Sequence, residues 1–116
     1  MTAERDALAD RVRALLPHDR RVREVSMFGG LSFMVDDSMA VATGRDGGLL
    51  VRTVPARYDE LLRVPGAGPA VMGDRPMGPG WTAVASDALG DDQLAFWCAV
   101  GLEAARTTRR PGTGTR

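Results

Sequence analysis

The feature that most constrains the fold is the run of residues 21–53, which is typical of strands joined by tight turns and begins with Val22, Val25 and Met27. Residues 31–35 alternate between apolar and more polar side chains, which is typical of a strand with one buried face. Residues 36–38 and 44–48 carry the Asp and Gly clusters that form tight turns, and the second contains Asp-Gly, a strong hairpin signal. Because connections this short join neighbouring antiparallel strands, the sequence predicts an antiparallel meander.

Helical periodicity marks three other segments. Residues 3–16 place Leu and Val on one stripe, and the following proline ends the helix. A short apolar face over residues 55–63 begins with Pro55, which suits a first helical turn. The final helix, capped by Asp91, has the clearest apolar stripe, formed by Leu94, Trp97, Cys98, Gly101, Leu102 and Ala105.

The remaining segments complete an α+β domain. Residues 64–80 are rich in Gly and Pro and predict a loop, while residues 81–85 resemble a last strand. The predicted fold is a small antiparallel sheet of four to five strands with flanking helices, in the order α-β-β-β-β-α-β-α. It occupies residues 1–107, and residues 108–116 have the composition of a disordered basic tail.

Composition excludes several classes of protein. The 116 residues carry fifteen basic and fifteen acidic side chains, so no strong net field steers a charged partner. The single cysteine, Cys98, excludes an internal disulfide and a zinc site built from several cysteines. Neither a secretory leader pattern nor an apolar stretch of about 20 residues is present. We therefore expect a cytoplasmic bacterial protein with no membrane association.

The residue types that carry catalysis are sparse and poorly placed. His18 is the only histidine, follows a proline, and is interpreted as a solvated loop residue. Cys98 lies on an apolar helical stripe and is interpreted as a small buried hydrophobe. The pairs Asp36/Asp37 and Asp91/Asp92 fit turn and cap chemistry. Because all fifteen basic residues are Arg, a phosphate loop with its lysine and Schiff-base chemistry are both excluded. We expect no catalytic residues, no metal, no cofactor and no enzymatic activity.

A basic stretch near the N-terminus is the candidate for weak nucleic-acid contact. Asp10, Asp19 and Glu24 dilute its charge, and no aromatic residue lies before Phe28, so a solvated face is the favoured interpretation. The Arg-rich tail would add weak, salt-sensitive attraction to a polyanion. The residues of this stretch are Arg11, Arg13, Arg20, Arg21 and Arg23.

Arg52 and the Gly/Pro-rich segment are the candidates for a contact surface. Arg52 interrupts an apolar strand, where it would either pair with an acid across the sheet or bind an anionic group. Methionines are numerous, and they serve either an irregular core, the favoured reading, or an adaptable binding surface. The loop that leads to Met77 and Trp81 is the best candidate for binding, since loops carry function more often than core elements.

Three blocks together resemble the TfoX N-terminal domain family, also called TfoX/Sxy-like. The blocks are the Met-Phe-Gly-Gly hairpin over residues 27–39, the strand at residues 49–52, and Gly-Asp-Arg-Pro-Met at residues 73–77 followed by Trp81 and the final helix. In order and spacing they cover roughly residues 3–107. Two departures are visible: Val25 and Ser26 stand where the family usually has a basic residue, and the segment before Trp81 has no charge.

The resemblance implies an α+β fold and an association with the regulation of natural competence. The favoured hypothesis is a non-enzymatic regulatory or protein-interaction domain that binds a partner or itself, as a dimer through a sheet edge or the Met77/Trp81 region. Its predicted interaction residues are Met27, Phe28, Gly29, Gly30, Arg52, Met77 and Trp81. The alternatives are a nucleic-acid-associated module and a domain that binds a small anionic ligand at Arg52.

Overall fold

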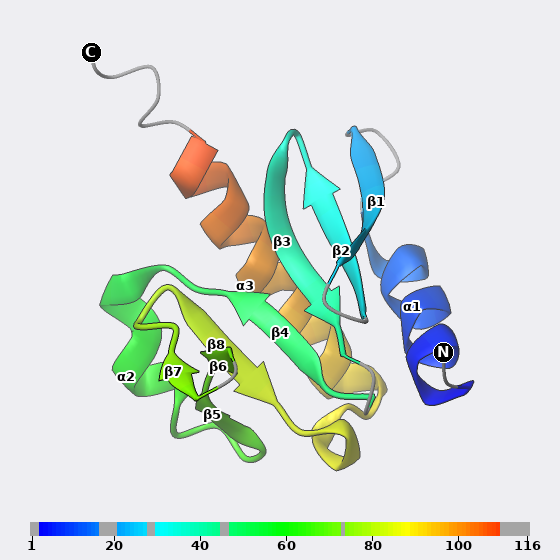
Figure 1. Cartoon of the computed structure of the whole chain (residues 1–116). Helices are drawn as coiled ribbons and strands as arrows, with labels where there is room; N and C mark the ends of the chain where they lie inside the picture. The colour runs from blue at the N-terminus through cyan, green and yellow to red at the C-terminus, as the bar shows by residue number, and fades with distance from the viewer. Residues whose placement is uncertain (1–2, 17–20, 28–29, 45–46, 73, 110–116) are drawn as a thin grey trace.

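The computed structural model describes residues 3–16, 21–27, 30–44, 47–72 and 74–109. Within them the chain is an α+β domain, as the sequence predicts (Figure 1). Its helices are α1 (Ala3–Leu15), α2 (Tyr58–Leu61) and α3 (Asp91–Arg109). Its strands are β1 (Val22–Met27), β2 (Gly30–Val35), β3 (Ser38–Thr43), β4 (Leu49–Arg52), β5 (Ala67–Pro69), β6 (Val71–Met72), β7 (Arg75–Pro76) and β8 (Trp81–Val84).

The main sheet is antiparallel and has six strands in the order β1-β2-β3-β4-β8-β5. The predicted meander accounts for its first four strands, and β8 is the predicted last strand. The segment that we expected to be a loop instead supplies β5 at one edge of this sheet and a separate hairpin of β6 and β7. These strands are two or three residues long, too short to produce an alternation signal, and they depend on β8 and on each other for pairing.

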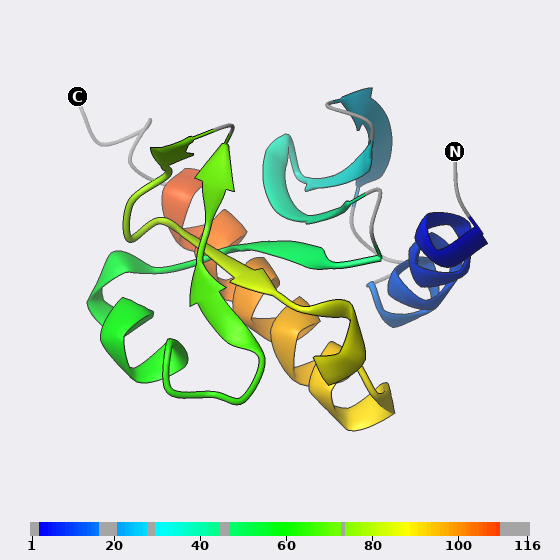
Figure 2. The same cartoon turned by 60° about the horizontal axis from the view of Figure 1, so that its bottom comes forward.

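All three helices lie on one side of the six-stranded sheet, with α3 crossing behind it (Figures 1 and 2). The core forms between this side of the sheet and the helices. Its largest fully buried side chains are Trp97 and Leu94 from α3, Phe33 from β2 and Leu61 from α2. Helix α1 contributes Leu8, Ala9, Val12 and Leu16, whereas Leu15, which we expected on the same stripe, is 42% exposed.

The second hairpin of the meander contains two unusual turn residues. Asp36 and Asp37, between β2 and β3, both have positive φ angles, 51° and 72°. Two successive left-handed residues match the twist of the flanking strands, although glycine or asparagine is the usual occupant. Asp36 and Asp37 form this turn, as predicted. The carboxylate of Asp36 also accepts a hydrogen bond from the backbone N–H of Arg21, just before β1 (3.3 Å).

Gly30 has a packing role that explains its place in the Met-Phe-Gly-Gly motif. A Cβ at this position would stand 1.8 Å from the carbonyl oxygen of Thr43 on β3. No side chain can be accommodated at that distance, so the close approach of β2 to the end of β3 requires glycine here.

Both ends of α3 differ slightly from expectation. The backbone N–H of Leu94 donates to the carbonyl of Gly90, so Asp91 lies in the first helical turn instead of capping the helix. At the other end α3 continues through Arg109, so the first two residues of the predicted tail are helical. Residues 110–116 lie outside the described residues.

Candidate functional site

Arg52 and Trp81 are the two predicted site residues that the fold brings together. They lie directly opposite each other on β4 and β8, and the guanidinium carbon of Arg52 is 4.9 Å from the centroid of the Trp81 ring. This distance is within the range of a cation–π contact. The pairing follows from the strand register, which separates the two residues by 29 positions in sequence but makes them cross-strand neighbours.

The guanidinium of Arg52 has no anionic partner among the described residues. No carboxylate lies within ion-pairing distance of it and no oxygen accepts a hydrogen bond from it, so its recorded contact is the indole ring. The side chain is half-buried, and this desolvation lowers the pKa of Arg52. Of the two sequence-based alternatives, pairing with an acid across the sheet is therefore wrong for the described residues.

The segments that hold this pair are firmly positioned. Next to it, the backbone N–H of Thr53 donates to the carbonyl of Gly80 (2.8 Å), which extends the β4–β8 ladder by one bond. On the opposite, buried side of the same strands, the hydroxyls of Thr53 and Thr82 are 2.9 Å apart. The Thr53 hydroxyl also donates to the carbonyl of Val51 (3.1 Å). The Arg52–Trp81 pair thus stands on a backbone that is hydrogen-bonded on both strands.

The pair lies on the side of the sheet that no described helix covers. Residues alternate between the two sides of a strand, so Leu50 accompanies Arg52, and Ala83 accompanies Trp81. The register across β1, β2 and β3 adds further side chains to the same side. We call this surface the open face, and define it by Val25, Ser32, Met34, Met39, Ala42, Leu50, Arg52, Trp81 and Ala83. Arg23 lies opposite Met34 at its β1 edge, where it is exposed and 3.5 Å from Asp37.

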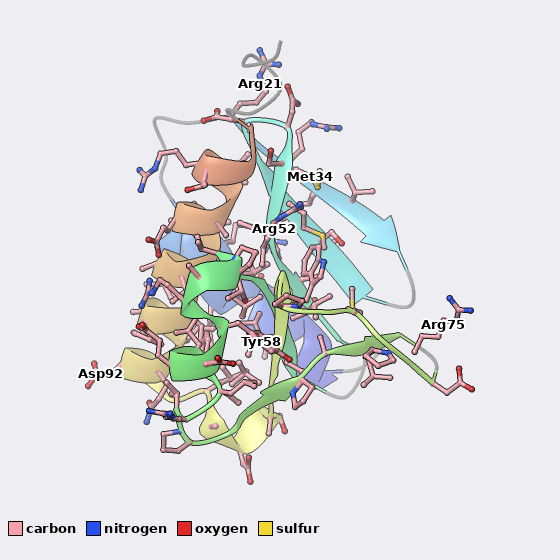
Figure 3. All side chains as sticks on the ribbon, turned by 90° about the vertical axis from the view of Figure 1, so that its left-hand side faces the viewer. Arg21, Met34, Arg52, Tyr58, Arg75 and Asp92 are labelled. Atoms are coloured by element: carbon pink, nitrogen blue, oxygen red, sulfur yellow. The ribbon has the colours of Figure 1, made fainter. Side chains whose placement is uncertain are left out.

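The open face is mainly apolar and partly exposed. Apart from Ser32, which is buried, its members are half-buried, and none of them is an acid. In Figure 3 the Arg52 side chain lies on the side away from α3, in the direction of Met34, while Arg75 on the β6–β7 hairpin projects on that same side. A binding surface with thioether and aliphatic side chains around one cation is suited to an apolar partner that carries one negative charge.

The other predicted interaction residues are distributed differently. Met77 is half-buried, and its backbone N–H donates to the carbonyl of Ala70 (2.9 Å), which anchors the segment before Trp81. Met27 pairs with Gly30 at the end of β1 and β2, at the opposite end of the strands from Arg52. Phe28 and Gly29 lie outside the described residues. The register therefore separates the paired residues Met27 and Gly30 from the Arg52–Trp81 pair.

Sequence reasoning missed five members of the candidate site: Val25, Ser32, Ala42, Leu50 and Ala83. A signal for Leu50 was present, because Leu49 and Val51 are buried and the residue between them must point to the opposite side together with Arg52. The same alternation applies to Ala42, between buried Val41 and Thr43, and to Ala83, between buried Thr82 and Val84. That these residues share one surface with Arg52 depends on pairing between strands that are distant in sequence.

The basic stretch near the N-terminus is largely paired with acids. Arg11 donates to the carbonyl of Leu89 (2.8 Å) and to Asp91 (3.1 Å), which ties α1 to the start of α3. Arg13 binds Glu24 through two hydrogen bonds, of 2.5 and 2.8 Å, and also binds Asp10. Arg23 lies 3.5 Å from Asp37. The side chain of Arg21 has no partner among the described residues, and Arg20 lies outside them. Weak nucleic-acid contact by these residues stays a prediction.

The groups set aside as catalytic candidates do not converge within the described part of the chain. Cys98 is buried in the core, and desolvation raises the pKa of its thiol to about 11, which keeps it protonated at neutral pH. Asp91 pairs with Arg11, and Asp92 is exposed and points away from the sheet (Figure 3). Among the described residues no three His, Cys, Asp or Glu side chains are placed to hold a metal ion. His18 lies outside them.

None of the described helices has both the length and the apolar character needed to cross a membrane. This finding covers the described residues only, and the expected cellular location stays a prediction.

Comparison with known proteins identifies the family. Residues 14–105 match the family described as the TfoX N-terminal domain, which is most of the 116-residue chain. No curated protein and no solved structure matches the chain. The chain therefore belongs to the TfoX N-terminal domain family, as its motifs predict, and this family is regulatory and has no known catalytic activity.

Proposed function

We propose that this member of the TfoX N-terminal domain family is a non-enzymatic regulatory domain that binds a protein partner through its open face. The observation that carries the proposal is the open face itself: a partly exposed, mainly apolar sheet surface centred on the Arg52–Trp81 pair. Surfaces of this kind on small domains mark interaction sites. An association with natural competence is part of the proposal, since it is what the family resemblance implies.

The charge of Arg52 favours a partner protein over a second copy of the chain on this face. Face-to-face association of two identical molecules would bring their Arg52 guanidinium groups towards each other without an acid between them. Like charges in a partly desolvated interface are costly. A partner that supplies its own negative charge avoids this repulsion.

Site-specific photo-crosslinking in the host organism tests the proposal. A photo-reactive phenylalanine analogue replaces Leu50 on the open face, and the matched control places the same analogue at exposed Asp92. We expect a discrete crosslinked protein from position 50 that is absent from position 92. Sedimentation of the purified chain shows whether it forms a dimer by itself, and so distinguishes a crosslink to a foreign partner from one to a second copy. Identical crosslinking patterns from both positions, or crosslinks from position 50 to this chain alone, would contradict the proposal.

A genetic test addresses the regulatory role. In a host strain that lacks the gene, the wild-type chain and the variant Asp92→Ala should restore the measured transformation frequency. Leu50→Arg should fail, because a second cation is placed beside Arg52 on the open face. Thermal unfolding of each purified variant shows that the fold is retained. Full restoration by a folded Leu50→Arg chain would exclude the open face from the regulatory role.

A further inference from the structure

The charge of Arg52 has no counter-ion and its N–H groups have no hydrogen-bond acceptor among the described residues. Exposed arginines such as Arg63 and Arg75 are hydrated by solvent, whereas Arg52 is half-buried and has lost part of its water. An arginine stays protonated at neutral pH, so this cation persists without a counter-ion. A bound anion at this position would gain a charge-assisted hydrogen bond in a partly desolvated setting, where such bonds are strongest.

The geometry leaves the donors of Arg52 available. The indole ring of Trp81 occupies one face of the guanidinium, at 4.9 Å from its carbon to the ring centroid. The N–H groups of a guanidinium lie in its plane and point away from the edge of the group, so stacking on a ring does not consume them. Because no oxygen of the described residues accepts from them, two parallel N–H groups remain free for one carboxylate.

The surroundings favour a protein segment with a single acid over a nucleic acid. The neighbouring side chains on the open face are Met34, Met39 and Leu50, which can pack against apolar side chains of a partner. Binding of a polyphosphate backbone requires several cations in a row, and single strands require a series of aromatic platforms. Among the half-buried residues of the open face Arg52 is the sole cation and Trp81 the sole aromatic, and one side of that ring is already covered. Exposed Arg23 lies at the β1 edge of this face, where it is 3.5 Å from Asp37.

We propose that Arg52, held on Trp81, binds the carboxylate of one Asp or Glu within an apolar segment of the protein partner. This inference rests on the proposed function and adds the chemistry that selects the partner. The neighbouring methionines and Leu50 accept the apolar side chains on either side of the acid, and the guanidinium selects the acid itself. Neutral segments of the same shape bind weakly, because they leave the cation without an anion.

A pair of capped peptides tests the inference directly. One has the sequence Ser-Leu-Leu-Glu-Leu-Leu-Ser, and the other has Gln in place of Glu. Titration into the full chain, followed by the indole N–H resonance of Trp81, should give at least about tenfold tighter binding of the Glu peptide, the difference expected for one hydrogen bond to a charged group. The other tryptophan of the chain, Trp97, is buried, so its indole N–H resonance serves as an internal reference.

Two variants tie the discrimination to Arg52. In Arg52→Gln the preference for the Glu peptide should fall to about twofold or less, while Arg52→Lys keeps the charge but loses the paired donors and should retain an intermediate preference. The matched control is Arg63→Gln, which removes an exposed arginine outside the open face and should leave the preference unchanged. The comparison of the two peptides on the wild-type chain does not depend on the folding of any variant.

The outcomes separate the two proposals. Equal binding of both peptides with a shift of the Trp81 resonance would overturn carboxylate recognition and leave the open face as a protein-binding surface. Absence of binding by either peptide would overturn the inference, and the crosslinking experiment at position 50 would then decide the proposed function alone. A further outcome is that single-stranded oligothymidine binds more tightly than the Glu peptide and loses this affinity in Arg52→Gln. That result would assign Arg52 to phosphate recognition and would also overturn the inference.

Discussion

The carbonyl oxygen of Ala40 on β3 lies 2.5 Å from the point where a Cβ would stand on Gly101 of α3. The side chain of Val41 is almost as close to that point, at 2.8 Å. Helix α3 therefore packs directly on the backbone of β3, and the absence of a side chain at Gly101 sets the distance between helix and sheet.

Replacement of Gly101 by alanine should destabilise the protein. Alanine favours a helix over glycine by about 1 kcal/mol, but here the added methyl meets backbone atoms, so we expect a net loss of about 1–3 kcal/mol in the free energy of unfolding. The control is Ala99→Gly at an exposed position of the same helix, where only the propensity loss of about 1 kcal/mol applies. Denaturant unfolding measures both, and a stabilised Gly101→Ala would disprove the close approach.

The buried hydroxyls of Thr53 and Thr82 should show coupled energetics. Replacement of Thr53 by the isosteric valine leaves the Thr82 hydroxyl buried without its partner, which should cost about 1–3 kcal/mol. The double variant Thr53→Val/Thr82→Val removes both polar groups and should cost less than the sum of the single changes. A double-mutant cycle by chemical denaturation gives the coupling, and strictly additive values would refute the hydrogen bond.

The Arg13–Glu24 pair should contribute a pH-dependent part of stability. Hydrogen bonding by the Arg13 guanidinium lowers the pKa of Glu24 below its ordinary range. A carboxyl with a depressed folded-state pKa stabilises the fold above its unfolded pKa, and this contribution is lost as the pH falls through the folded value. Because both partners are partly exposed, we expect Glu24→Gln to lose no more than about 1 kcal/mol at neutral pH.

The measurement for this pair is the free energy of unfolding as a function of pH for the wild type and Glu24→Gln. The two curves should be separated at pH 7 and converge in acid. Asp92→Asn, at an exposed carboxyl that has no partner within the described part of the chain, is the control and should give no such separation. A gap between wild type and Glu24→Gln that widens towards low pH would have the wrong sign.

The thiol of Cys98 should be unreactive in the native protein. Burial raises its pKa to about 11, so little thiolate forms near pH 8, and the surrounding core blocks reagents. We expect negligible labelling by a thiol reagent in buffer and one equivalent in denaturant. Because the folded pKa is the higher one, the stabilising effect of keeping this thiol neutral should decline as the pH rises from the unfolded value towards 11. Rapid labelling of the native chain would contradict this placement.

The turn between β2 and β3 should tolerate, and benefit from, glycine. Asp37 has a φ of 72° and pairs with Arg23 only at 3.5 Å on the surface. We expect Asp37→Gly to raise stability by up to about 1 kcal/mol, since glycine adopts this conformation without steric cost. Asp36→Gly is the contrast, because it also removes the hydrogen bond from the Arg21 backbone and should gain less. Thermal melts of both variants decide the order.

The elements of this fold that have a local periodic signal were predictable. The alternation in β2, β3, β4 and β8 and the stripe of α3 reflect which side of a strand or helix is buried, a property that each segment carries in its own residues. The short strands β5, β6 and β7 carry no such signal. Each has three residues or fewer. β5 becomes a strand because it pairs with β8, and β6 and β7 become strands because they pair with each other.

The candidate site shows the same division. By itself the sequence determined the fold class, the family and the presence of a charged residue, Arg52, in an apolar strand. The tertiary structure decided that, among the described residues, Arg52 has an indole and no acid as its neighbour, and that Leu50 and Met34 lie on the same open face. It also decided that the paired residues Met27 and Gly30 are at the other end of the strands. The physical reason is strand register: alternation tells which side of its own strand a residue occupies, whereas its cross-strand partner depends on the packing of α3 and on pairings between segments far apart in the chain.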